Sequence, residues 1–366
     1  MKQRYRAVKL DGSGARWQKL FHEFWPAYRS WFLKEGEAQR PDRKTCERAL
    51  ERHMPELAPT WRKLTELAGD DDLAARMLSL YRPPAYIFGC SQAVWLRGEP
   101  FLVRNYDYSP RLSEGVIVHS NWNGVRVVGM SDCLWGLVDG INEHGLALSL
   151  TFGGRKESGD GFGIPLILRY ALETSKTIDE AVATLERIPS HMAYNVLALD
   201  ASGRHAAVEL TPDQPARVTT APATANHQTD GVWPEYAAQT KTLERVDFLM
   251  RRLGDEAETS ERFVERFAED PLYQQEYESS FGTLYTAVYR PSRGRVEYIW
   301  PGFVSRQSVE NFREGEALIY YGDPSPEEQA ELEAWEHAAP AGEDWRRYLV
   351  QAPAEWRKYL PQFLFE

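Results

Sequence analysis

The sequence predicts an α+β protein in which two β-sheets are covered by helices. Residues 85 to 150 contain short apolar runs separated by Asn-Gly and Gly-containing turns, the pattern of consecutive β-strands. Two helical segments follow within residues 166 to 188, and further strand pairs follow these helices. Strands, two helices and then strands again suggest two sheets with helical cover.

The N-terminal part predicts helices. Residues 13 to 35 place aromatic side chains three and four positions apart, with charges between them and a kink expected at Pro26. A helix packed on its own domain is favoured over a partner-binding or membrane-lying helix, because the aromatic face is continuous enough to need a core. Three shorter helices are expected after Pro41, near Glu56 and after Gly69. Residues 1–89 are therefore predicted to form a helical segment.

The strand-rich part predicts a hairpin that continues into a meander. Its strands are expected at residues 115 to 120, 125 to 131 and 145 to 151. The Gly-rich stretch 156 to 165 lacks the Lys-Ser/Thr ending of a phosphate-binding loop, and we expect it to cover a substrate.

The second half predicts alternating helices and hairpins. Helices are expected at residues 166 to 175, at 177 to 188 with Thr177 as N-cap, and at 242 to 253; hairpins are expected at 195 to 210 and 285 to 300. Residues 323–366 are predicted to form a helical C-terminal extension packed across the main body. A homo-oligomer contact is the second interpretation of this extension.

Composition excludes several classes of function. Among 366 residues, 54 acidic and 43 basic side chains give a formal net charge of −11, and no basic block is interleaved with aromatics. Binding to nucleic acid or to anionic membranes is therefore not expected. No apolar run is long enough to span a membrane, and the basic N-terminus is not followed by an apolar signal region, so we expect a cytoplasmic protein.

The cysteine content leaves a thiol available for chemistry. The chain has three cysteines, Cys46, Cys90 and Cys133, and their spacing is not that of metal ligands. Because the number is odd, the sequence does not predict a disulfide framework. It predicts no metal site and indicates no cofactor.

Cys90 lies in a predicted hairpin. Residues 91 to 96 and 101 to 106 are rich in β-branched and aromatic residues and flank a short turn at Gly98. If the turn is centred near Gly98, the return strand brings Arg104 alongside Gln92 and Asp107 alongside Gly89. A thiol, a guanidinium and a carboxylate then converge at one strand end.

The Gly89-Cys90 pair permits self-cleavage. Glycine adopts the strained backbone that an adjacent thiol could attack. Passage through a thioester and hydrolysis would leave Cys90 as a new N-terminal residue. Its α-amine, with an ordinary pKa of about 7.7 to 8.0, could act as general base for its own thiol.

Three ordered segments resemble a known family. Gly89-Cys90-Ser91, Arg104-Asn105-Tyr106-Asp107 and the Asp139-Gly140-Ile141-Asn142-Glu143-His144-Gly145-Leu146 stretch together resemble the self-processing N-terminal nucleophile hydrolases. The similarity is greatest to the acyl-coenzyme A:6-aminopenicillanic acid acyltransferases, also called peptidase C45. Choloylglycine hydrolases and penicillin V acylases are more distant. The resemblance covers residues 50 to 305, and it implies a four-layer αββα sandwich over residues 90–322.

The resemblance also implies further site residues. Asn195 corresponds to an Asn that donates to the oxyanion, and a backbone N–H near Thr151 is the candidate second donor. Asn226 and His227 resemble an Asn-His-Phe element, although Gln228 replaces the aromatic residue. Tyr106, Asn226, His227 and Arg245 are candidate substrate-binding residues, with a solvated helix face an equal alternative for Arg245.

The spacing of Arg104 and Asp107 poses a geometric problem. Residues three apart on an extended strand face opposite sides, so both can reach Cys90 only if the strand bulges or ends near Tyr106. Asp107 would then hold the α-ammonium of Cys90, and Arg104 would favour the thiolate.

These features predict a self-processing amidase or acyltransferase. Cys90 would form a thioester with the acyl group of a small-molecule amide or acyl thioester and pass it to water or an amine. One alternative is a relative of the same fold that never matures and has a binding or structural role. Another is a Cys-His hydrolase with His119, His144 or His227 as the base.

Overall fold

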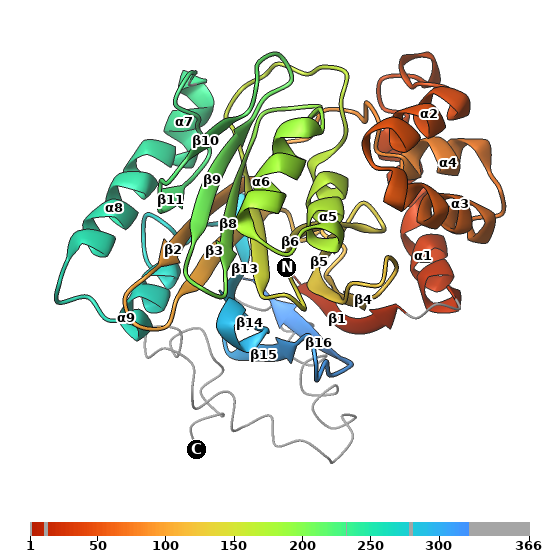
Figure 1. Ribbon diagram of the computed structural model, residues 1–366. Helices are drawn as coiled ribbons and strands as arrows, with labels where there is room; N and C mark the ends of the chain where they lie inside the picture. The colour runs from red at the N-terminus through yellow and green to blue at the C-terminus, as the bar shows by residue number, and fades with distance from the viewer. Residues whose placement is uncertain (1, 11–13, 232, 278–280, 322–366) are drawn as a thin grey trace.

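A computed structural model describes residues 2–10, 14–231, 233–277 and 281–321 (Figure 1). The C-terminal extension expected at residues 323–366 lies outside the described residues. Among those described, none of the helices combines the length and the apolar composition needed to cross a bilayer.

The larger of two sheets has nine strands in the order β10-β9-β8-β7-β6-β5-β4-β1-β16. Its middle is an antiparallel meander that runs from β4 to β9. The bounds are β1 Lys2–Leu10, β4 Val116–Ser120, β5 Val127–Asp132, β6 Gly136–Asn142, β7 Leu146–Phe152, β8 Tyr194–Asp200, β9 His205–Leu210, β10 Arg217–Thr219 and β16 Gly315–Tyr320.

The smaller sheet carries Cys90. Its order is β11-β2-β3-β13-β14-β15, with β12 paired to β13. Strands β2 and β3 form the expected hairpin, and the register is as predicted: Gln92 pairs with Arg104, and Gly89 pairs with Asp107. The bounds are β2 Gly89–Trp95, β3 Phe101–Tyr108, β11 Ala223–Thr224, β12 Gln275–Glu276, β13 Phe281–Arg290, β14 Arg295–Trp300 and β15 Phe303–Ser308.

The two sheets pack face to face, and each carries helices on its outer side (Figure 1). Helices α5 (Ile164–Thr174) and α6 (Ile178–Arg187) cover the nine-stranded sheet, and Thr177 caps α6 as predicted. Helices α8 (Thr242–Gly254) and α9 (Ser260–Glu265) cover the other sheet over a separate apolar core. The architecture is the expected four-layer αββα sandwich.

The predicted N-terminal helices are present beside the sandwich (Figure 1). They are α1 Ala15–Phe32, α2 Arg43–His53, α3 Ala58–Leu67 and α4 Asp72–Leu78. Asp42 and Asp71 cap α2 and α4 by accepting bonds from backbone N–H groups. Trp17 anchors α1 through its indole, which donates to the carbonyl of Leu134 at 2.9 Å.

Two expectations about the strands are wrong. Residues 1–89 are not wholly helical, because β1 lies inside the nine-stranded sheet, parallel to β4 and antiparallel to β16. The meander does not continue the Cys90 hairpin either, since the two belong to different sheets. The short helix α7 (Pro234–Thr240) and strand β6 were also not predicted.

Candidate active site

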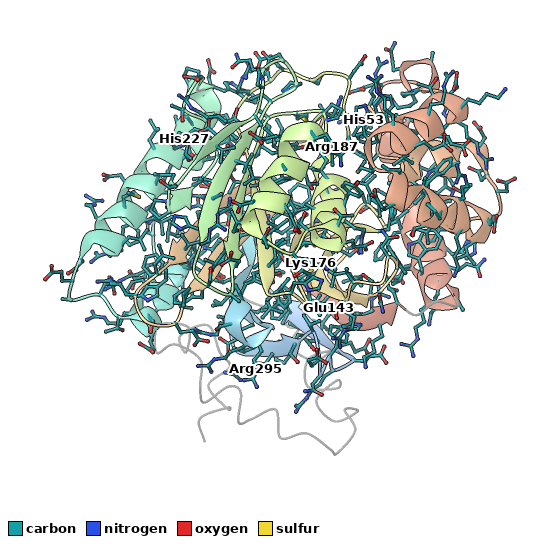
Figure 2. All side chains as sticks on the ribbon, in the orientation of Figure 1. His53, Glu143, Lys176, Arg187, His227 and Arg295 are labelled. Carbon is teal, nitrogen blue, oxygen red and sulfur yellow. The ribbon has the colours of Figure 1, made fainter. Side chains whose placement is uncertain are left out.

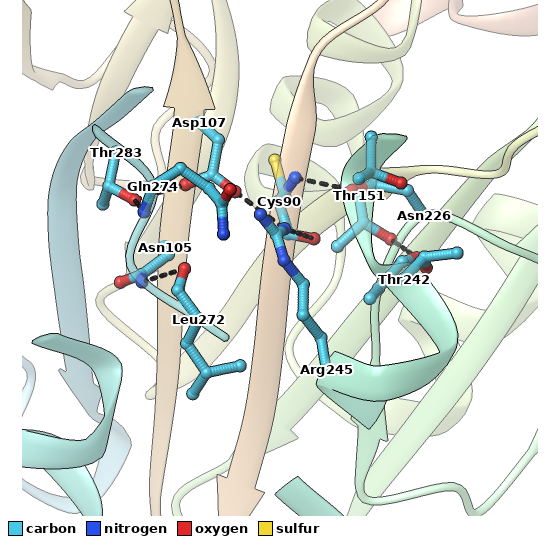
Figure 3. A network of polar contacts seen from close by, with 12 residues as sticks. Cys90, Asn105, Asp107, Thr151, Asn226, Thr242, Arg245, Leu272, Gln274 and Thr283 are labelled. Carbon is cyan, nitrogen blue, oxygen red and sulfur yellow. Dashed lines mark hydrogen bonds and ion pairs between the residues drawn. The ribbon is translucent and has the colours of Figure 1, made fainter. Parts of the chain in front are cut away.

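Cys90 lies on β2 between the two sheets and is wholly buried in the unbroken chain. Its sulfur and its backbone nitrogen have different partners. Arg104 Nη2 donates to the sulfur at 3.1 Å. The backbone N–H donates to Asn226 Oδ1 at 3.0 Å, and Figure 3 shows this nitrogen turned toward Asn226.

Arg104 is fixed by groups from the facing sheet. Its Nε donates to the carbonyl of Leu150 on β7 at 2.9 Å. Its Nη1 forms an ion pair with Asp139 Oδ2 on β6 at 2.5 Å, and neither side chain is exposed. The ring of Tyr106 lies 4.6 Å from the guanidinium carbon, at cation–π distance. These contacts leave Nη2 directed at the sulfur.

Asp107 lies on the opposite face of β3, beneath helix α8. Its Oδ2 pairs with Arg245 Nη1 at 2.8 Å, and both side chains are wholly buried. Thr283 Oγ1 donates to Oδ1 at 2.7 Å. Arg245 Nη1 also approaches the carbonyl oxygen of Cys90 at 3.4 Å (Figure 3). The solvated-face interpretation of Arg245 is therefore wrong.

The expected bulge or strand end near Tyr106 is absent. Strands β2 and β3 pair without a break from Gly89 and Asp107 to Trp95 and Phe101. The irregularity lies instead on the neighbouring strand β13, between Thr283 and Tyr285. The side chains of β3 alternate between the two faces of the sheet without distortion. Arg104 contacts its partners between the sheets, whereas Asp107 contacts Arg245 under α8.

Asn195 and Asn226 lie in one network. Asn195 Nδ2 donates to the carbonyls of Ala225 at 2.8 Å and His227 at 3.0 Å, which flank Asn226. It also donates to Thr151 Oγ1 at 3.1 Å. Asn195 thus holds the segment from which Asn226 contacts Cys90. The oxyanion roles of Asn195 and the Thr151 backbone remain predictions.

The segment just before Cys90 is packed among aromatic residues. Phe88 is almost wholly buried, and its ring centroid lies 5.7 Å from that of Tyr106 and 6.0 Å from that of Tyr194. Tyr236 on α7 donates to the carbonyl of Phe88 at 2.9 Å. The groups on both sides of the Gly89-Cys90 bond are therefore held in place.

Two of the three histidines considered as bases have partners other than Cys90, and the third, His144, is exposed. His227 lies near α7 (Figure 2), and its Nδ1 is 2.8 Å from Thr242 Oγ1. His119 interacts through Nε2 with the carbonyl of Val309. Within the described ranges, no contact joins His119, His144 or His227 to Cys90, and no group of three or more His, Cys, Asp or Glu residues is arranged to hold a metal ion.

Burial keeps the thiol protonated in the unbroken chain. It raises the pKa of Cys90 to about 12, although the neighbouring Arg104 lowers this pKa. Burial also raises the pKa of Cys46 to about 11 and that of Cys133 well above its ordinary value. What distinguishes Cys90 is therefore its contact with the guanidinium of Arg104.

Comparison with protein families shows the family of the chain. The model of the acyl-coenzyme A:6-aminopenicillanic acid acyl-transferase family matches residues 95–304, more than half of the sequence. The chain belongs to this family. The matched region begins after Cys90. The assignment of Cys90 as the nucleophile therefore depends on its contacts with Arg104 and Asn226.

Solved structures show more distant similarity. Penicillin V acylase from Agrobacterium tumefaciens is 14% identical, with 61% of this chain and 87% of that chain covered and a TM-score of 0.44. The Caenorhabditis elegans N-acylethanolamine-hydrolyzing acid amidase ortholog is 16% identical, with 63% and 100% covered and a TM-score of 0.43. No curated protein matches the chain.

Proposed function

We propose that this acyl-transferase family member is a self-processing amidohydrolase or acyltransferase with Cys90 as its nucleophile. The observation that carries the proposal is the contact of Cys90 with two different polar groups. A cation lies at the sulfur, and a side-chain amide lies at the nitrogen that would become the free α-amine.

Self-cleavage would proceed through an N-to-S acyl shift. The sulfur of Cys90 attacks the carbonyl carbon of Gly89, the C–S bond forms, and the C–N bond between the two residues breaks. The thiol proton passes to the nitrogen of Cys90. Water then hydrolyses the thioester, which yields the Gly89 carboxylate and restores the thiol.

Turnover would use the same two atoms. The new α-amine takes the thiol proton, and the thiolate attacks the substrate amide. The departing amine takes the proton back, and water or an acceptor amine then receives the acyl group from the thioester.

Asn226 would hold the nitrogen that becomes the α-amine, because its Oδ1 accepts the backbone N–H of Cys90 whereas its Nδ2 donates to the carbonyl of Phe152 at 3.3 Å. It lies at Cys90, and Asn195 supports it by holding the flanking carbonyls. The oxyanion donors would be Asn195 and the backbone N–H near Thr151, and loss of one preorganised donor typically lowers the rate on the order of 100- to 1,000-fold. Asp107, paired with Arg245, would act from the other face as the counter-charge for the α-ammonium of Cys90.

The substrates would be small-molecule amides. The related structures suggest two probes, penicillin V and an N-acylethanolamine, with amine release followed by fluorescamine. We expect release by the unaltered chain and none by Cys90→Ala. Equal release by both would refute the assignment of Cys90. A cytoplasmic location belongs to the same proposal and can be checked by microscopy of a tagged chain.

A further inference from the structure

Asp139 forms the centre of a buried polar cluster that the proposed reaction does not use directly. It lies on β6 of the nine-stranded sheet, whereas its partners lie on β3, β13 and β14 of the other sheet. Its side chain is wholly buried. The cluster therefore bridges the interface between the two sheets, and it contacts Nη1 of Arg104 whereas the thiol contacts Nη2.

The carboxylate of Asp139 is saturated with donors. Tyr285 donates to Oδ2 at 2.7 Å, the oxygen that also pairs with Arg104. Tyr289 donates to Oδ1 at 2.5 Å, and Tyr298 lies 2.8 Å from the Tyr289 hydroxyl. Burial raises the pKa of each of the three tyrosines well above the ordinary value of tyrosine, so their hydroxyl groups stay protonated and act as neutral hydrogen-bond donors.

This cluster restricts how Arg104 can lie. Nη1 is held by Asp139 and by the Tyr285 hydroxyl at 3.2 Å, while Nε is held by the carbonyl of Leu150. A planar guanidinium fixed at two of its nitrogens has no rotational freedom at the third. Nη2 must therefore point at the sulfur of Cys90.

The carboxylate also changes the charge that the thiol meets. A buried guanidinium without a counter-charge would favour the thiolate strongly, since an opposite charge is felt more in a poorly screened interior. The negative charge of Asp139, which pairs with Nη1 of the same guanidinium, opposes this effect.

We propose that Asp139 is a positioning residue for the reaction at Cys90, which orients Arg104 toward the sulfur and limits how strongly its charge favours the thiolate. The inference rests on the proposed function. Asp139 itself does not touch the reacting atoms, so its influence must pass through Arg104, and this dependence can be measured.

The test is a double-mutant cycle on the rate of self-cleavage, followed on denaturing gels after refolding of the unfolded precursor. Asp139→Asn keeps the side-chain volume and removes the charge. We expect it to slow cleavage on the order of 100-fold, the effect of misplacing a reacting group by about 1 Å. In the Arg104→Ala background the same change should slow cleavage no further.

The pH profile separates positioning from a general loss of structure. With the opposing charge removed, the cleavage rate of Asp139→Asn should reach half of its own maximum at a lower pH than that of the unaltered chain. A merely structural effect would lower the rate without moving this midpoint. Glu173→Gln is the matched control, because Glu173 forms a wholly buried ion pair with Arg169 away from Cys90.

The outcomes are distinct. Independent, multiplying rate effects of Arg104→Ala and Asp139→Asn, or an unchanged midpoint, would overturn the inference. If the unaltered chain does not cleave at all, the proposed function fails instead. All variants are then unbroken, and alkylation of Cys90 by iodoacetamide decides the inference: Asp139→Asn must shift its pH dependence only where Arg104 is present.

Discussion

Arg104 and Asp107 lie three residues apart on β3, yet their side chains extend to opposite faces of the sheet. Arg104 contacts the sulfur of Cys90 between the two sheets, whereas Asp107 pairs with Arg245 beneath α8. The sulfur of Cys90 is therefore contacted by Arg104 on one face of the sheet, and its carbonyl oxygen is approached by Arg245 on the other face.

The Asp107–Arg245 pair predicts a large loss of stability in Asp107→Asn. The variant leaves a buried guanidinium without its counter-charge, which typically costs about 3–5 kcal/mol. Chemical denaturation should show this decrease in the free energy of unfolding, and cleavage should be impaired.

Asp247→Asn is the control, because Asp247 pairs with Arg251 on the exposed side of α8. An exposed pair of this kind contributes about 1 kcal/mol or less. Equal losses in the two variants would show that the Asp107–Arg245 pair has no special importance.

The three cysteines should differ in function despite similar burial. Cys90→Ala is expected to remain full length and to be inactive. Cys46→Ala and Cys133→Ala should cleave and turn over normally, because these thiols are small buried groups away from Arg104. Loss of thioester labelling in Cys133→Ala, with labelling retained in Cys90→Ala, would contradict the assignment.

Arg104→Ala should slow cleavage at every pH at which the thiol of Cys90 is mostly protonated. Burial already raises the pKa of Cys90 to about 12, and removal of the guanidinium raises it further. Each unit by which this pKa rises lowers the thiolate fraction about tenfold at any pH well below it, so the variant should cleave more slowly by the same factor throughout that range. Equal cleavage rates of the variant and the unaltered chain at the same pH would show that Arg104 does not tune the thiol.

The carboxyl pair of Asp132 and Glu114 predicts a pH-dependent stability. Burial, together with the charge of Glu114, raises the pKa of Asp132 from 3.8 to about 7, and the Tyr28 hydroxyl bridges the two carboxyl groups. The protonated form is favoured in the folded state. The contribution of protonated Asp132 to the free energy of unfolding is therefore complete below about pH 4, and it is lost as the pH rises through about 7.

Thermal unfolding at a series of pH values can test this expectation. Asp132→Asn should be more stable than the unaltered chain above neutral pH, by at most a few kcal/mol, and the difference should vanish in acid. A variant that is less stable at every pH would contradict the assigned direction of the shift.

The position of β1 predicts that the two cleavage products stay together. Residues 2–10 pair on both sides within the nine-stranded sheet. The products should therefore co-elute in native size-exclusion chromatography. Ala7→Pro, which cannot keep the ladder of a central strand, should promote their separation, and Ala7→Gly is the control that retains the N–H. Separate elution of the unaltered products would refute this prediction.

Local patterns in the sequence were sufficient for much of the fold. The turn at Gly98 was enough to predict the β2–β3 register, and cap residues such as Thr177 marked helix starts. Strand β1 was missed because its partners are remote: Ala7 pairs with Ile117 and Gly315. No local signal in Lys2–Leu10 indicates such neighbours.

The site was predictable only in part for the same reason. Cys90, Arg104 and Asp107 share one hairpin, so their proximity follows from the sequence. Arg245 reaches Asp107 across 138 residues, and whether its helix face is buried depends on the packing of α8. The sequence shows Asp139 as part of a family-like motif but does not predict its contact with Arg104, because that contact forms only when the two sheets pack together.

Self-cleavage between Gly89 and Cys90 is the central claim, and a denaturing gel with N-terminal sequencing of the larger product tests it most directly. Self-cleavage should give fragments of residues 1–89 and 90–366, the second beginning with Cys90. A single full-length band from a preparation with full amidase activity would contradict it.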